Sequence, residues 1–313
     1  KQIEEAYYWK ALCKWKKGNL QVSMEELYSL LSNSSSKSIL SKCHLSLAEI
    51  SKELSYQDSS LYHLKNAAKF TQDRDEKGVI YGRLAEMAFE LNQYDIAKDG
   101  YSNVIAHSLS KEKIENAHLQ ILKILRIQKE YKLASRKIKA LLSDDKFKRI
   151  SGNLELELVN LYRAEGEDDE IENRLKSIVN DYQRTEVSAE AYHQLGEIYS
   201  SEKWDLEKAK EYYGNVSKES NRSLFSSSAK SRLLAITTYQ NTLKEIETIN
   251  FMDSDNEEVD NNLNISVVAS VKSLPELYYQ LADLEAFSFS RYSESINIFE
   301  KIILEFPETE FKP

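Results

Sequence analysis

Side chains that could do chemistry are few and scattered in this sequence of 313 residues. No two of its histidines are three or four residues apart, so no helix face carries a pair of metal ligands. The sequence also lacks a glycine-rich phosphate loop and a Gly-x-Ser-x-Gly nucleophile turn. We therefore predict no catalytic, cofactor-binding or metal-binding residues and expect no enzyme activity. The histidines are His44, His63, His107, His118 and His193.

An acidic segment over residues 252–264 is the other candidate for chemistry. Three acidic residues alternate near its start, as they do in a calcium loop: Asp253, Asp255 and Glu257. However, Glu258 stands at the sixth place, where an EF-hand requires Gly, and Asn264 stands at the twelfth, where it requires Glu. We interpret the segment as a flexible acidic insertion, with an ion site as the alternative.

The two cysteines, Cys13 and Cys43, are expected on the apolar faces of first helices in successive repeats. A buried thiol acts as a small apolar filler, and we predict this role for both. A disulfide requires facing Cβ atoms at short distance, and the two cysteines are expected at different heights along their helices. Two cysteines do not decide the redox compartment.

Composition indicates a helical chain. Gly occurs 8 times and Pro 3 times, which leaves few helix breakers for this length. The balance of 42 Lys and Arg against 51 Asp and Glu gives a net charge of -9, which argues against nucleic acid as a partner. No apolar run approaches the ~20 residues of a transmembrane helix.

The elements that position any functional side chain are paired helices in a repeat. The segment 81–104 reads as two short helices with a polar break at Asn92. Its apolar pattern recurs at a step of 37 residues, so that Tyr81, His118 and Tyr192 share one place in the repeat. A one-residue insertion follows Tyr199. A short helix pair cannot cover both of its apolar faces, so the copies are expected to stack on one another.

The fold class predicted is all-α, a right-handed superhelical solenoid of about eight helix pairs forming one domain over 1–313. Residues 225–250 either continue as one helix or form a pair. The first residues read as helix interior without an initial Met, and the last resemble a connection, so we expect further residues at both ends. The units are expected at about 5–35, 40–72, 78–110, 115–147, 152–184, 189–220, 225–250 and 274–308.

The pattern Tyr192-x-x-Leu195-Gly196-x-x-Tyr199, followed by Ala209-x-x-x-Tyr213, resembles the tetratricopeptide repeat family. The resemblance covers nearly the whole chain, although the step is longer than the usual 34 of that family. It implies that the first helices line a concave groove that binds a protein or peptide. The Lys/Asn/Arg clamp of the chaperone-binding subgroup is missing, because Gly82 and Glu86, or Leu119 and Lys123, hold the matching places.

On this resemblance we expect a non-enzymatic scaffold or adaptor with protein or peptide partners and no cofactor. The expected contact residues on the concave face are Arg83, Glu86, Phe89, Leu119, Lys123, Arg126, Leu156, Asn160, Arg163, His193 and Glu197.

The linkers at 181–196 and 305–309 look like those of repeat lipoproteins of the bacterial cell envelope, including the outer-membrane assembly and Tol-Pal-associated groups. This similarity suggests a periplasmic or outer-membrane-associated location. The alternatives are a cytoplasmic regulator and a substrate-recruiting module of a larger enzyme.

Overall fold

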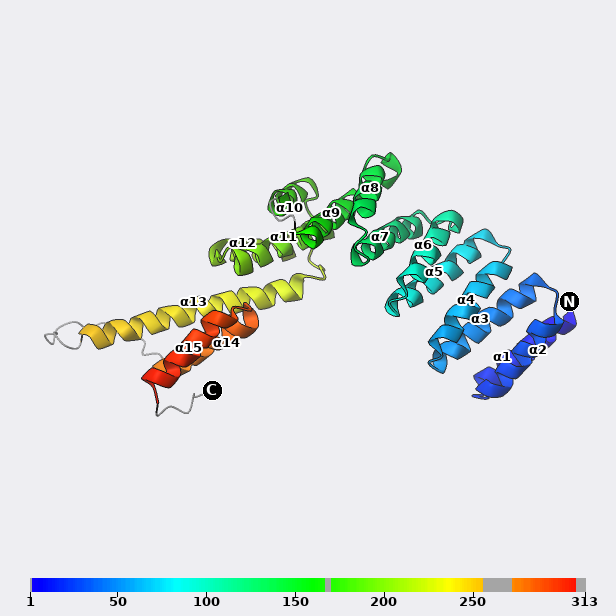
Figure 1. The fold of residues 1–313 in the computed structure, drawn as a ribbon, viewed down its shortest axis with the longest axis horizontal. Coiled ribbons are helices and arrows are strands. Elements are labelled where there is room, and N and C mark those ends of the chain that lie inside the picture. The colour runs from blue at the N-terminus through cyan, green and yellow to red at the C-terminus, as the bar shows by residue number, and fades with distance from the viewer. Residues whose placement is uncertain (1, 167–169, 256–271, 308–313) are drawn as a thin grey trace. The chain divides into compact units, whose positions relative to one another are not determined.

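The computed structural model describes residues 2–166, 170–255 and 272–307, and all regular secondary structure in these ranges is helical (Figure 1). The predicted all-α class, built from repeated helix pairs, is therefore confirmed. The chain divides into two compact units, Lys1–Glu167 (unit 1) and Asp168–Pro313 (unit 2). This division falls within the fifth predicted helix pair, and a single continuous solenoid stays a prediction.

Unit 1 consists of antiparallel helix pairs that follow one another along the chain, with each second helix also contacting the next first helix (Figure 1). Its elements are α1 (Gln2–Lys16), α2 (Leu20–Asn33), α3 (Lys37–Glu53), α4 (Gln57–Phe70), α5 (Arg74–Glu90), α6 (Tyr94–His107), α7 (Lys111–Ile127), α8 (Tyr131–Leu142), the 3-10 helix η1 (Asp145–Ile150) and α9 (Ser151–Glu165).

The structure of unit 2 decides between the two alternatives that the sequence allowed for residues 225–250, one helix or a helix pair. Helix α13 is continuous for 30 residues from Ser226, so the predicted unit at 225–250 is one helix and not a pair of helices. The first residues of the predicted acidic insertion belong to α13, and positions 256–264 lie outside the described residues. The elements are α10 (Ile171–Asp181), α11 (Glu186–Glu197), the π-helix η3 (Ile198–Glu202), α12 (Leu206–Glu219), α13 (Ser226–Asp255), α14 (Leu274–Asp283), the π-helix η4 (Leu284–Ser288) and α15 (Tyr292–Glu305).

The turn inside each helix pair has one residue in the left-handed backbone region. These residues recur at the 37-residue step, and Trp204 comes one residue later than the step requires. The π-helix η3 ends at Glu202, two residues before Trp204, and supplies the extra residue, because a π-turn contains one residue more than an α-turn. The insertion inferred from the sequence is therefore absorbed inside the helix. The series in unit 1 is Gly18, Ser55, Asn92, Lys129 and Gly166.

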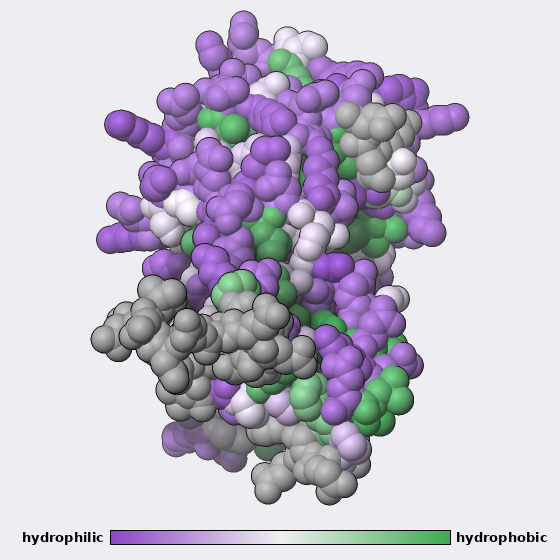
Figure 2. All heavy atoms as spheres, turned by 90° about the vertical axis from the view of Figure 1, so that its left-hand side faces the viewer, coloured by the Kyte–Doolittle hydropathy of each residue, from purple (hydrophilic) through white to green (hydrophobic). Residues whose placement is uncertain are grey.

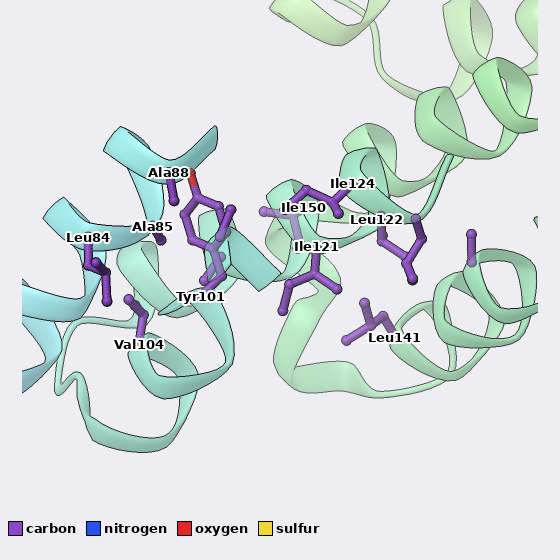
Figure 3. Packing of buried hydrophobic residues seen from close by; sticks show 14 of the residues in the cluster. Leu84, Ala85, Ala88, Tyr101, Val104, Ile121, Leu122, Ile124, Leu141 and Ile150 are labelled. Atoms are coloured by element: carbon purple, nitrogen blue, oxygen red, sulfur yellow. The ribbon is translucent and has the colours of Figure 1, made fainter. Parts of the chain in front are cut away.

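Small residues allow the helices of a pair to approach closely. A Cβ at Gly100 in α6 would lie 2.8 Å from the Cβ of Ala85 in α5, so only glycine fits there. Figure 3 shows Leu84 and Ala85 of α5 facing the side chains of Tyr101 and Val104, which come from α6. All four are at most 5% exposed, so the apolar stripes predicted from the sequence form the core of unit 1.

Aromatic rings mark the place in the repeat that Tyr81 holds. The ring of His44 stacks on Phe70 with centroids 5.7 Å apart, and Tyr81 stacks on His107 at 6.1 Å. The predicted packing of these rings between helices is thus observed. The prediction for Cys13 is wrong, because its side chain is exposed. Cys43 is buried as expected, and this burial raises the pKa of its thiol to about 12.

Two histidines that are distant in the sequence meet inside unit 1. Nδ1 of His44 lies 2.9 Å from Nδ1 of His63, so one nitrogen donates and the other accepts. Nε2 of His63 also bonds the hydroxyl of Tyr28 at 3.0 Å. Burial lowers the pKa of His44, and burial with repulsion from His44 lowers the pKa of His63 to about 4. The pair is therefore neutral at physiological pH.

This pair predicts that unit 1 loses stability in mild acid. The unfolded chain protonates both imidazoles near pH 6.5, whereas the folded chain resists protonation until lower pH. The free energy of unfolding should therefore fall as pH drops from 7 toward 4, by on the order of 2 kcal/mol. Urea unfolding at several pH values would measure this fall. It should be smaller in His63→Gln, and an equal fall in both proteins would contradict the assignment.

The left-handed turn residues predict a stabilising substitution. Lys129 has φ of 60°, which is strained for a residue with a Cβ, so Lys129→Gly should raise the free energy of unfolding by about 0.5–1 kcal/mol. Lys137→Gly, in the interior of α8, is the control and should lower it by about 1 kcal/mol. Thermal unfolding followed by circular dichroism would compare the two. A loss of stability in both variants would show that position 129 carries no strain.

Candidate functional site

The candidate site of unit 1 is the surface formed by the first helices α3, α5, α7 and α9, here called the first-helix face. Three contacts join successive first helices across it: the ion pair of Arg83 with Glu49, the ammonium of Lys123 at 5.1 Å from the ring centroid of Phe89, and a bond of 2.7 Å from Nε of Arg126 to Oε1 of Glu157. Four predicted contact residues therefore share one face and also hold its helices together. The face comprises Glu49, Arg83, Glu86, Phe89, Lys113, Asn116, Leu119, Lys123, Arg126, Glu157, Asn160 and Arg163.

One predicted contact residue of unit 1 is not on this accessible surface. Leu156 is only 3% exposed, because α9 packs its side chain into the interior of the unit. This corrects the expectation that Leu156 contacts a partner. Leu119 and Asn160 are half-buried and Arg163 is exposed, so part of each side chain remains accessible.

The two predicted residues of unit 2 make internal contacts. Nε2 of His193 bonds Oγ of Ser228 at 2.9 Å, and burial lowers the pKa of the imidazole. Glu197 accepts a hydrogen bond of 2.7 Å from the Tyr213 hydroxyl and one of 3.1 Å from Nε of Arg232. These residues of α11 therefore connect it to α12 and α13.

Two hollows open on the first-helix face of unit 1. The first, of about 170 Å³, lies between α5 and α7 and is lined by Gly82, Tyr101 and Val104. The second, of about 310 Å³, lies between α3 and α5 and includes Leu64 and Glu90. Both hollows are open to solvent. The lining of the first is mainly apolar with charged groups at its edge, whereas the lining of the second is mainly polar. Arg83 and Glu86 line both hollows.

The rim of the first hollow carries two opposite charges without an ion pair among the described residues. Glu86 comes from α5 and Lys113 from the first turn of α7, and both are exposed. Tyr101 beneath them keeps its proton, because burial, with a smaller contribution from Glu86 and Glu90, raises its pKa to about 12. Sequence reasoning missed Lys113. It lies six residues before the predicted contact residue Leu119, so extending that register toward the start of α7 would have found it.

Two carboxylates are buried in the described part of the chain, and both have basic partners. Glu115, 1% exposed, lies against Arg149, and Glu285, 3% exposed, accepts a bond of 2.7 Å from Tyr239 and lies 3.2 Å from Arg291. Burial raises the pKa of Glu285. Over the described ranges no three His, Cys, Asp or Glu side chains converge to hold a metal. Nor does any helix found there combine the length and apolarity needed to cross a membrane.

Unit 2 has a different exposed surface. Figure 2 shows a mainly hydrophilic face with hydrophobic residues gathered in its lower part, over α14 and α15. Exposed apolar side chains of η4 and α15 include Phe287, Tyr292, Ile296 and Leu304, which are 79%, 62%, 56% and 79% exposed. The last helix pair of unit 2 thus carries exposed apolar side chains, whereas the first-helix face of unit 1 is mainly polar.

Comparison with known proteins finds no matching family model and no matching curated protein. Among solved structures, the chain is similar to a tetratricopeptide repeat protein from Parabacteroides merdae ATCC 43184, with 14% identity, 99% of this chain and 96% of that chain covered, and a TM-score of 0.42. It is also similar to the C-terminal part of a TPR repeat-containing protein from Cytophaga hutchinsonii, with 12% identity, 93% and 98% covered, and a TM-score of 0.46.

A third similarity is to pilF of Pseudomonas aeruginosa, with 14% identity, 74% of this chain and 97% of that chain covered, and a TM-score of 0.39. All three similarities are at low sequence identity, so a functional proposal for this chain rests on its own geometry.

The contact between Arg126 and Glu157 predicts a measurable coupling between repeats. Their side chains are 26% and 14% exposed, so solvent screens the pair only in part. Arg126→Glu should lower the free energy of unfolding by about 1 kcal/mol, and adding Glu157→Arg should restore most of it. Urea unfolding of the single and double variants measures the coupling. The control is Arg136→Glu, at an exposed residue of α8, which should change the free energy of unfolding little. If the double variant were no more stable than Arg126→Glu alone, the coupling would be disproved.

Proposed function

We propose that this chain is a non-enzymatic scaffold that binds a protein or peptide partner through the first-helix face of unit 1. The proposal rests on which charged side chains of this face form ion pairs and which do not. Arg83 and Arg126 are engaged with acidic residues of neighbouring helices, whereas Glu86 and Lys113 beside an apolar hollow have no ion pair among the described residues. Apolar recesses with a few oriented polar groups are what ligand sites present.

The contacts between first helices favour tight binding by fixing this face in advance. A partner loses less binding free energy when the surface it meets is already ordered. We propose Glu86, Phe89, Leu119 and Lys123 as contact residues and add Lys113, while Arg83, Arg126, Asn160 and Arg163 form the edge of the face. In unit 2 we propose that His193 and Glu197 chiefly hold α11 against α12 and α13, because their polar atoms are engaged there.

We further propose that the chain is a tetratricopeptide-type repeat protein working in the bacterial cell envelope. The recurrent turn residues, the small residues between paired helices and the ring contacts support the repeat type. The envelope setting rests on the style of the linkers alone. In the linker before α11, Thr185 accepts a hydrogen bond of 3.2 Å from the backbone N–H of Ser188, so it caps that helix. Fractionation of cells that express the full-length product would distinguish an envelope protein from a cytoplasmic one.

Charge reversal at an unpaired residue tests the proposed binding face. Lys113→Glu breaks no ion pair among the described residues, so the fold should persist while a partner that uses the face binds at least about tenfold more weakly. The measurement is affinity capture with the full chain, followed by titration of the captured partner. The matched control, Lys139→Glu, reverses an exposed lysine on α8 and should bind as the native chain does. Equal binding by Lys113→Glu would remove this face from the proposal.

A further inference from the structure

The hollow between α5 and α7 exists because a glycine stands where neighbouring repeats carry a large side chain. At the 37-residue step, Gly82 corresponds to Leu45 in α3 and to Leu119 in α7. Both leucines are half-buried against the core of unit 1. At Gly82 this side chain is missing, and Tyr101 and Val104 form the base of the resulting space of about 170 Å³.

Neither the backbone nor a close neighbour requires glycine at position 82. A Cβ there would lie 3.7 Å from Cγ2 of Val104, which is an ordinary van der Waals contact. By contrast, a Cβ at Gly78 would lie 2.8 Å from the backbone nitrogen of Ser108, so packing explains that glycine. Gly82 lies in the interior of α5, where glycine destabilises a helix relative to most residues. Packing within the chain therefore leaves Gly82 and its hollow unexplained.

We propose that the hollow at Gly82 receives one aliphatic side chain of leucine size from a peptide segment of the partner protein. This proposal rests on the proposed function and specifies its ligand. The incoming side chain would occupy the place that Leu45 and Leu119 fill in the adjacent repeats. It would contact the apolar surfaces of Tyr101 and Val104, and removing its surface from water supplies the attraction.

The two charges at the rim define the residues that flank this side chain. Three charged residues line the hollow, and Arg83 of α5 is already paired with Glu49 of α3. The other two are Glu86 on α5 and Lys113 on α7, so the rim is acidic on the α5 side and basic on the α7 side. A peptide with a basic residue on the α5 side and an acidic residue on the α7 side is complementary to this arrangement. Such charge complementarity determines which peptide sequences bind and in which orientation they lie.

Filling the hollow from within the chain tests the proposal. Gly82→Leu places the side chain of the neighbouring repeats in the hollow, and thermal unfolding should shift upward by a few degrees, because glycine is removed from a helix interior. The probe is a phage-displayed library of random twelve-residue peptides selected on the full native chain. Enriched peptides should carry Leu, Ile or Met between residues of opposite charge. They should bind Gly82→Leu at least about tenfold more weakly, since the side chain no longer enters.

Matched variants separate the possible outcomes. Gly214→Leu, at an open position of α12, is the control and should leave peptide affinity unchanged. Gly82→Ala fills the hollow only in part and should weaken binding less than Gly82→Leu does. The double swap Glu86→Lys with Lys113→Glu should select peptides with the flanking charges reversed.

Peptides that bind the native chain and Gly82→Leu equally would overturn the site while leaving the proposed function standing. Selection of no peptide by the native chain would overturn both. Enrichment of peptides without an aliphatic residue would overturn the assigned ligand.

Discussion

Close approach of two helices at small residues is the constraint on which the rest of unit 1 depends. At Ala85 and Gly100 the backbones of α5 and α6 come so near that an added Cβ would overlap. This contact sets the distance between the two helices and allows Leu84 and Val104 to be buried against each other's helix. Each pair still exposes apolar area on its outer sides, and burial of that area against the next pair is what makes the repeat cooperative.

Polar contacts between repeats fix the positions of side chains on the surface of this apolar core. Arg83, Lys123 and Arg126 each reach a neighbouring first helix, so the face is a connected lattice of side chains. Exposed pairs of this kind contribute little stability individually. Their larger effect is to fix the positions of groups that remain available to a partner. Most charges on this face are therefore engaged, while Glu86 and Lys113 have no ion pair within the described part of the chain. In the function we propose, these two charges contact the partner.

The structure departs from the regular repeat where the chain has an extra residue or a buried charge. In unit 2 the extra residue before Trp204 is accommodated by a π-turn at the end of the first helix, so the turn keeps its left-handed residue. A second π-turn, η4, precedes Ser290 in the last pair in the same way. In unit 1 the buried carboxylate of Glu115 holds the place that Gly78 has one repeat earlier, and Arg149 of η1 lies against it.

The sequence alone determined the all-α class, the 37-residue step and most of the core, because apolar periodicity and the size of a residue directly govern how neighbouring helices pack. It placed Tyr81 and His118 correctly between helices for the same reason. Contacts between helices, by contrast, set the exposure of Cys13, the burial of Leu156 and the hydrogen bond of His44 with His63. The same contacts set which charges of the first-helix face have an ion pair among the described residues. These outcomes depend on which residues of adjacent helices contact each side chain. The spacing of residues along one helix does not predict those contacts.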